Sequence, residues 1–144
     1  MFVVNVEGAI HRDGKWLMIT RSEKEEHAAG CLSMVGGKCD LEGVSSDILE
    51  RTLKREIYEE VGIEVEDFTY VNSSSFVTDK ETHVIDIVFL CQHFTGEPYA
   101  KSTEEVGEVM WMTTEEILIH KDAPSYLKEN ITLAANKFTL IRGV

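Results

Sequence analysis

Apolar residues recur at every fourth position over residues 49–61 and would form one continuous stripe along an α-helix. Asp47 stands where a helix N-cap is expected, because its side chain can accept the unpaired amides of the first turn. Gly62 stands where the helix should end, because glycine adopts the left-handed C′ conformation without steric cost. The pattern therefore predicts a helix between Asp47 and Gly62.

The other apolar runs are short, often β-branched, and bounded by turn residues, which is typical of strands. Residues 2–10 and 16–20 flank a turn at residues 12–15 and predict a hairpin. The most hydrophobic run, residues 83–91, predicts a central strand buried on both faces. The remaining predicted strands cover residues 30–37, 64–78 and 109–112, and the remaining predicted helices cover residues 113–118 and 124–140.

Strands before and after a central helix predict an α/β fold with a mixed sheet between helices. The chain has 144 residues, of which 43% are hydrophobic, and it contains no internal repeat or interdomain linker. We therefore expect a single domain over residues 1–144 with a substantial core.

The negative net charge of the chain limits the kinds of molecule that it is expected to bind. The net charge is −12, from 26 acidic and 14 basic residues, and such a surface repels phosphate backbones. A nucleic-acid partner is therefore not expected, whereas a small phosphorylated ligand could bind through a divalent cation. The three cysteines, the lack of a signal-peptide core and the lack of a membrane-length apolar run favour a cytoplasmic protein without a membrane partner.

Three carboxylates lie beside the predicted apolar stripe. Glu56, Glu59 and Glu60 are three and four residues apart, so they would be neighbours on one flank of the helix. Their mutual repulsion, and their position near the negative end of the helix dipole, disfavour the ionised state. A solvated helix face is the ordinary interpretation of such a run, but hard carboxylate oxygens are also the ligands that Mg²⁺ and Mn²⁺ prefer.

Residues 55–63 read Arg-Glu-Ile-Tyr-Glu-Glu-Val-Gly-Ile and match the second half of the Nudix box, R-E-U-x-E-E-x-G-U with U apolar. The sequence Gly-Gly-Lys at residues 36–38 resembles the opening of the box. The chain thus resembles the Nudix hydrolase family. Residues 96–101, together with His27 and Ala28, resemble its MutT-like branch, and the acidic loop and strand at residues 105–111 are also typical of the family. Nine residues separate Gly37 from Asp47, which stands at the position of the first glutamate, and this loop is longer than the family's.

The resemblance implies a Nudix-type α/β/α sandwich and a Mg²⁺-dependent pyrophosphohydrolase, with Mn²⁺ as an alternative ion. It implies metal ligation by the three glutamates of the box together with the backbone of Gly37. It further implies that Arg55 orients a metal-binding glutamate and that a loop glutamate, for which we choose Glu105 over Glu104, is a ligand or general base. Glu59 remains a second candidate for the base.

Arg21 and Lys38 carry the positive charge that a bound diphosphate needs, and the backbone of Gly36 and Gly37 would contact it.

The expected reaction is hydrolysis of a nucleoside diphosphate linked to another group. The MutT-like features favour an unmodified or oxidised nucleoside triphosphate, cleaved to monophosphate and pyrophosphate. A hydrolase of ADP-ribose, another dinucleotide or a sugar nucleotide is the alternative within the enzyme class, and a nucleotide-binding regulator without turnover is the alternative outside it. Monomers and homodimers are both compatible with the family.

Other residues are candidates for roles in the pocket. Ser33 and Met34 precede the glycine pair and are expected to flank the base. Four aromatic side chains are candidates for stacking on the base, although most of them should lie in the core (Phe76, Phe89, Trp111 and Tyr126). A zinc site formed by His27, Cys31 and Cys39 is not expected, because the spacing fits no common ligand pattern.

Overall fold

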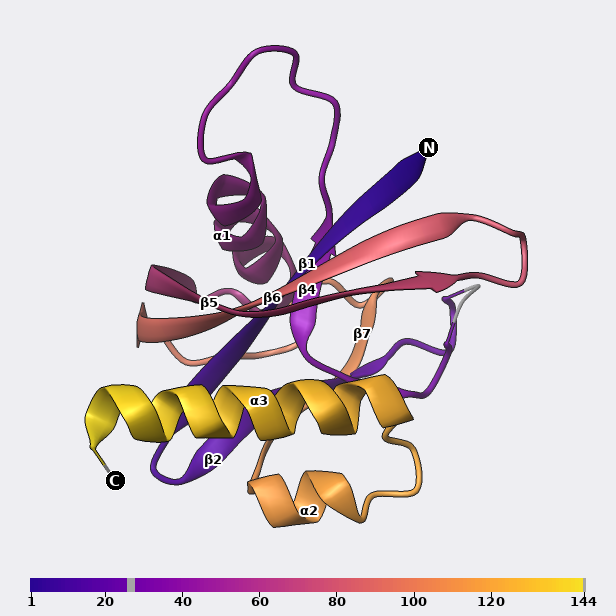
Figure 1. Cartoon of the computed structure of the whole chain (residues 1–144). Helices are drawn as coiled ribbons and strands as arrows, with labels where there is room; N and C mark the ends of the chain where they lie inside the picture. Colours follow the sequence, from indigo (N-terminus) through magenta and orange to yellow (C-terminus); the bar gives the residue numbers. More distant parts are fainter. Residues whose placement is uncertain (26–27, 144) are drawn as a thin grey trace.

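The computed structural model describes residues 1–25 and 28–143, so His27 lies outside the described residues. The described chain forms seven strands and three helices (Figure 1). In chain order these are β1 (Phe2–Arg12), β2 (Lys15–Arg21), β3 (Leu32–Ser33), β4 (Val35–Lys38), α1 (Ile48–Val61), β5 (Glu64–Val77), β6 (His83–Thr95), β7 (Val106–Met112), α2 (Thr114–Leu118) and α3 (Ser125–Arg142).

The seven strands form a mixed sheet, as the sequence predicted. The order along its main path is β3-β2-β1-β6-β5, with β4 paired to β1 and β7 paired to β2. Strands β1 and β6 are parallel, and the other pairs are antiparallel. The long strand β6 lies between β1 and β5, which confirms its predicted central position.

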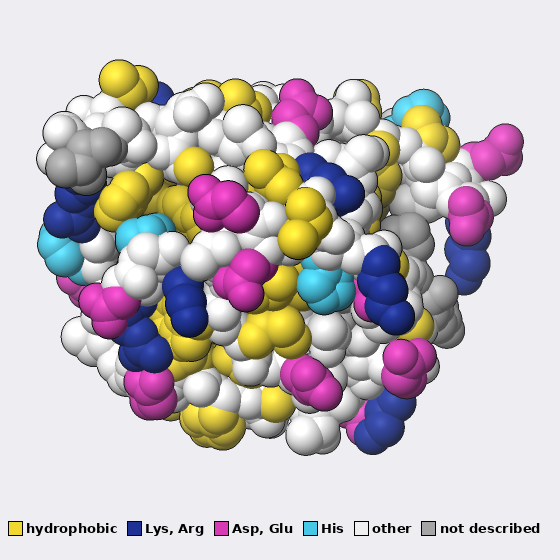
Figure 2. Space-filling view, turned by 90° about the horizontal axis from the view of Figure 1, so that it is seen from below, with side chains coloured by type: hydrophobic (Ala, Val, Ile, Leu, Met, Phe, Trp, Pro, Cys, Tyr) yellow, Lys and Arg dark blue, Asp and Glu magenta, His cyan; other side chains and the backbone are white. Residues whose placement is uncertain are grey.

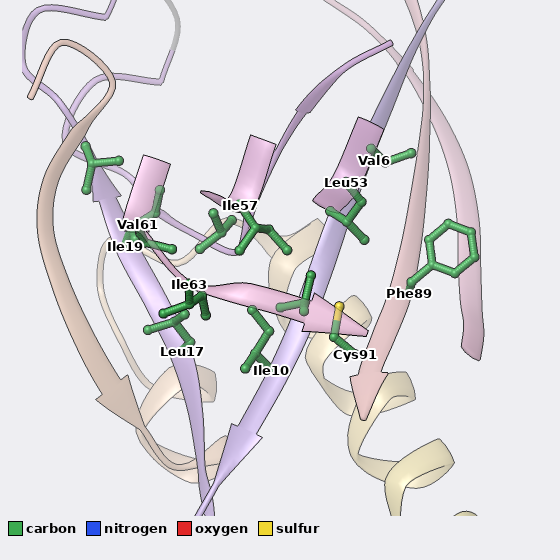
Figure 3. Close-up of a cluster of buried hydrophobic side chains, with 13 residues drawn as sticks. Val6, Ile10, Leu17, Ile19, Leu53, Ile57, Val61, Ile63, Phe89 and Cys91 are labelled. Carbon is green, nitrogen blue, oxygen red and sulfur yellow. The ribbon is translucent and has the colours of Figure 1, made fainter. Parts of the chain in front are cut away.

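Helices cover both faces of the sheet, with α1 on one side and α2 and α3 on the other (Figure 1). The stripe of α1 packs into one apolar cluster together with residues of β1, β2 and β6, and Figure 3 shows these side chains meeting. The second cluster joins the other sheet face to Ile117 of α2 and to Leu127 and Ile131 of α3. The predicted α/β/α sandwich is confirmed.

The two ends of α1 differ in how well the sequence predicted them. Gly62 has φ 73° and donates its N–H to the Tyr58 carbonyl at 3.0 Å, which confirms the predicted C-terminal stop. Asp47 occupies the N-cap position, but its side chain makes no capping hydrogen bond. Its backbone is left-handed, with φ 55°, whereas a capping side chain normally needs an extended backbone.

The predicted single strand over residues 30–37 is wrong, because this segment forms two strands on two partners. Strand β3 pairs with β2, and β4 pairs with β1 in the register Val35 to Gly8 and Lys38 to Asn5. The chain therefore crosses between two branches of the sheet at Met34, which is buried. This crossing places the glycine pair inside a strand beside β1 instead of in a turn.

The sheet divides at β1, and the division creates the space for the site. Residues 5–8 of β1 pair with β4, whereas β2 pairs with β1 only at His11 and Arg12. The β3-β2-β7 branch thus leaves the β4-β1-β6-β5 branch, and a cavity lies between them.

The outer face formed by α2 and α3 carries acidic and basic side chains intermixed with apolar ones (Figure 2). Within residues 1–25 and 28–143, no helix is long and apolar enough to cross a membrane.

Candidate active site

Three carboxylates come together at the end of the cavity. Glu56 and Glu60 lie one turn apart on α1, and Glu105 lies directly before β7. One ligand oxygen from each of these residues lies within 4.8 Å of those of the other two. Two residues of the helix and one residue of a loop that is distant in sequence therefore form one acidic group.

Hydrogen bonds to the last turn of α1 hold the Glu105 loop in place. The backbone N–H of Lys101 donates to the Glu60 carbonyl at 3.0 Å, which uses an oxygen that a helix end leaves unpaired. The Glu105 carbonyl accepts from the Ser22 N–H at 2.9 Å, just beyond the end of β2. The loop is thus fixed between α1 and β2, and this fixes the backbone of Glu105.

The glycine pair lets β4 pass directly under this group. A Cβ on Gly36 would lie 1.9 Å from the Val6 carbonyl oxygen, and one on Gly37 would lie 2.4 Å from the carboxyl carbon of Glu56. The Gly36 N–H donates to Glu60 Oε1 at 3.3 Å. Side chains at these positions would therefore displace β1 or the carboxylates.

The electrostatics of the group favour a cation. Burial, the hydrogen bond that protonated Glu60 donates to Glu105, and the charges of Glu105 and Glu56 raise the pKa of Glu60 to about 9. Burial also raises the pKa of Glu56, although the nearby Arg55 guanidinium opposes this. Buried carboxyls held this close lose their charge unless a positive ion compensates it. Their oxygen chemistry fits a hard divalent metal ion.

Arg55 connects the acidic side chains along α1. Its guanidinium lies 3.0 Å from Glu56 Oε1, 3.6 Å from Glu59 Oε1 and 3.4 Å from Asp40 Oδ2. Glu59 was expected among the metal ligands, but its side chain is 54% exposed and it is not part of the compact group of described residues. Its carboxylate lies next to Arg55, whose guanidinium also contacts Glu56 of that group.

The structure separates the two loop glutamates. The Glu104 carboxylate is 77% exposed and lies 3.4 Å from Lys24 Nζ, whereas Glu105 hydrogen-bonds to Glu60. Of the two, only Glu105 belongs to the acidic group.

A cavity of about 710 Å³ opens beside the carboxylates and extends between the two branches of the sheet. Arg21 and Lys38 line it, as does the glycine pair, and Arg21 also pairs with Glu25 at 3.2 Å. Ser33 and Met34 line it as well. The structure therefore brings the expected phosphate-binding and base-flanking residues to one cavity.

Sequence reasoning missed a polar floor of this cavity, formed by Asn5, Glu7 and Asp86. Glu7 and Asp86 are only 9% and 3% exposed, and Asn5 Nδ2 donates to Asp86 Oδ1 at 2.8 Å. Burial, followed by the charge of Asp86 and a hydrogen bond to it, raises the pKa of Glu7. The sequence signal that could have revealed this floor is a single acidic residue within each of two largely apolar strands, Glu7 in β1 and Asp86 in β6.

Two of the four candidate aromatic residues reach the cavity. Phe76 of β5 and Tyr126 of α3 line it, with ring centroids 6.1 Å apart and an interplanar angle of 14°. Phe89 belongs to the core cluster around α1, and Trp111 packs against that cluster.

The α/β/α sandwich thus places a carboxylate group beside a cavity in the volume range of small-molecule sites, and such a group can hold a divalent metal ion that supports hydrolysis. The NUDIX domain family model matches residues 1–131. The 8-oxo-dGTP diphosphatase of Escherichia coli is 28% identical over 106 residues, which cover 74% of this chain and 76% of that protein.

Two solved structures share the whole architecture. A MutT NUDIX hydrolase from Burkholderia pseudomallei superposes with a TM-score of 0.80 and 27% identity, covering 92% of this chain and 98% of that chain. A MutT protein from Methanosarcina mazei has a TM-score of 0.81 and 25% identity, covering 95% of both chains. The chain belongs to the Nudix family, and its predicted MutT-like pyrophosphohydrolase class is confirmed. Nudix hydrolases act on nucleotides and generally use divalent metals, which agrees with the acidic group found here.

Proposed function

We propose that this protein is a Mg²⁺-dependent nucleoside triphosphate pyrophosphohydrolase that releases a nucleoside monophosphate and pyrophosphate. The observation that carries the proposal is the acidic group of Glu56, Glu60 and Glu105 at the end of a 710 Å³ cavity. A cavity of this volume is within the range of small-molecule sites. The named activity of the E. coli relative makes oxidised and unmodified guanine triphosphates the first candidates.

The acidic group would hold the metal, with Glu59 and the Gly37 carbonyl as additional ligands from the neighbouring helix turn and strand. A bound divalent ion supplies charge neutralisation to the phosphate oxygens and lowers the pKa of water. Glu56 and Glu60 would bind it as carboxylates, so each would have to lose the proton that burial favours. Mn²⁺ has similar ligand preferences and is expected to replace Mg²⁺.

The remaining residues orient the reactants. Glu105 is exposed and hydrogen-bonded to Glu60, so it can accept a proton from water at the solvent side of the group. Arg55 fixes the Glu56 carboxylate through its 3.0 Å contact. Arg21 and Lys38 contribute positive charge to the cavity wall and would bind the phosphate oxygens.

Product analysis tests the proposal. Ion chromatography would follow a panel of unmodified and oxidised triphosphates, ADP-ribose, dinucleoside polyphosphates and sugar nucleotides, with Mg²⁺, Mn²⁺ or EDTA. We expect pyrophosphate and monophosphate from triphosphates only when metal is present. Turnover confined to ADP-ribose or to sugar nucleotides would overturn the substrate assignment, and binding without turnover would overturn the proposed reaction.

A further inference from the structure

The buried acidic side chains of the polar floor, Glu7 and Asp86, lie outside the carboxylate group that could hold a metal ion, and without a metal ion they would repel phosphate. We propose that Glu7 and Asp86 determine the choice of nucleobase and select a base whose edge presents adjacent N–H donors, as guanine and its oxidised forms do. This inference rests on the proposed function, since it assumes that the occupant of the cavity is a nucleotide.

The strand register sets the floor. Asn5 of β1 pairs with Asp86 of β6 in the parallel ladder, and Glu7 pairs with Val88. Because side chains alternate along a strand, Asn5 and Glu7 point to the same sheet face, and Asp86 points to that face beside Asn5. All three line the cavity, which also reaches the carboxylates of α1.

Packing alone does not explain this pair of acids. Both side chains are more than nine-tenths buried, and burial of two carboxyls is costly unless their oxygens and proton find partners. An apolar pair of similar volume would fill the same space at no such cost. We therefore expect the carboxyl groups of Glu7 and Asp86 to hydrogen-bond to the ligand that fills the cavity.

The hydrogen-bonding inventory of the floor favours a donor-rich base. Asp86 accepts from Asn5 and is hydrogen-bonded to Glu7, and the two carboxyl groups retain further acceptor lone pairs. Guanine presents adjacent N1–H and N2–H donors on one edge. Hypoxanthine lacks the 2-amino donor, and the corresponding edge of adenine offers an acceptor beside its single amino group. The floor therefore matches guanine best.

The walls are consistent with a flat ring above this floor. Phe76 and Tyr126 form a stacked pair at the cavity, and their exposed fractions of 38% and 44% leave surface for a base. Aromatic stacking accepts any base, so the polar floor must supply the discrimination.

The test compares dGTP with dITP, which differ only by the 2-amino group. The wild-type protein should hydrolyse dGTP with a kcat/KM roughly 10-fold or more above that for dITP, because a site built to bind an N–H group rejects the analogue that lacks it. Glu7→Gln and Asp86→Asn should reduce this ratio to about 1–3 through loss on dGTP, with dITP hydrolysis retained. Glu129→Gln on the exposed face of α3 is the matched control and should keep the wild-type ratio.

Three further measurements separate the causes of failure. Thermal unfolding of each variant identifies a folding defect, and binding of Mn²⁺-pyrophosphate, which carries no base, reports whether the acidic group is intact. Equilibrium binding of dGMP and dIMP gives the base preference even if no triphosphate is hydrolysed, so failure of the proposed function remains distinguishable. A dGTP/dITP ratio unchanged in both variants, or an equal loss on both nucleotides in folded variants, would overturn the inference.

Discussion

The substitution Glu60→Gln should stabilise the metal-free protein at alkaline pH while it abolishes turnover. The folded protein holds the Glu60 proton up to a pKa of about 9, whereas the unfolded chain releases it near 4.5. Between these values the folded state binds more protons, so the free energy of unfolding falls as pH rises. In EDTA, the contribution of Glu60 to the stability of the wild-type protein is therefore fully present below pH 4.5 and is lost progressively toward pH 9.

The magnitude follows from this pKa difference. At 1.36 kcal/mol per pH unit, ionisation of Glu60 alone would cost about 4.8 kcal/mol between pH 4.5 and pH 8. Glu60 shares a hydrogen bond with Glu105 and the site can relax, so we expect about 2 kcal/mol. Glutamine has nearly the same shape, can still accept from the Gly36 N–H, and cannot ionise.

Urea denaturation at pH 5 and pH 8, in EDTA and in Mg²⁺, measures this effect. In EDTA the Glu60→Gln variant should match the wild type within about 0.5 kcal/mol at pH 5 and exceed it by about 2 kcal/mol at pH 8. In Mg²⁺ the order at pH 8 should reverse, because only the wild type gains the metal-binding free energy. A variant that is less stable than the wild type by the same amount at both pH values in EDTA would refute the reasoning.

Three other substitutions probe the site and the core. Gly37→Ala should weaken Mn²⁺ binding roughly 10-fold or more in calorimetric titrations, because the new Cβ would lie 2.4 Å from the carboxyl carbon of Glu56; wild-type affinity would contradict the close approach. Glu105→Gln should lower kcat by about 100-fold or more, whereas Glu104→Gln should retain most of it; equal losses in steady-state assays would show that the two loop glutamates are not distinct. Ile57→Ala should lower the free energy of unfolding by about 2–5 kcal/mol in urea denaturation, since Ile57 is fully buried between α1 and the sheet. A decrease below 1 kcal/mol would show that the apolar stripe of the helix is not part of the core.

The local patterns of the sequence predicted most of the fold. The four-residue spacing of apolar residues gave α1, and Gly62 marked its end correctly because a left-handed C′ residue is a local requirement. The short helix after β7 was predicted from its capping signature, and Thr113 and Glu116 form a capping box there. These features depend on neighbours in the chain, which a sequence displays directly.

Features that depend on strand pairing were harder to predict. The sequence predicts one strand around Met34, because nothing in the composition of this segment reveals that β3 and β4 pair with different partners. From the sequence, the glycine pair indicates either close approach of a ligand or a turn, whereas the structure shows that β1 and Glu56 occupy the space that side chains would need there. Such constraints arise only when distant strands are in register.

The geometry of the site was also only partly predictable, because it depends on contacts between residues that are distant in the sequence. The helical spacing predicted that Glu56 and Glu60 lie side by side, but it could not show that Glu59 is 54% exposed and outside the compact group of described residues. The sequence indicates only that Glu7 and Asp86 lie in strands. It does not show that they are neighbours, because the pairing of β1 with β6 brings them together only in the folded chain.

The most direct test of the central claim, that Glu56, Glu60 and Glu105 hold a catalytic divalent metal, is a titration of the protein with Mn²⁺ followed by electron paramagnetic resonance. Pyrophosphate release is measured on the same samples. The wild type should bind Mn²⁺ and gain activity in parallel, whereas Glu60→Gln and Glu105→Gln should lose both. Undiminished Mn²⁺ binding in both variants, or pyrophosphate release by the wild type in excess EDTA, would contradict it.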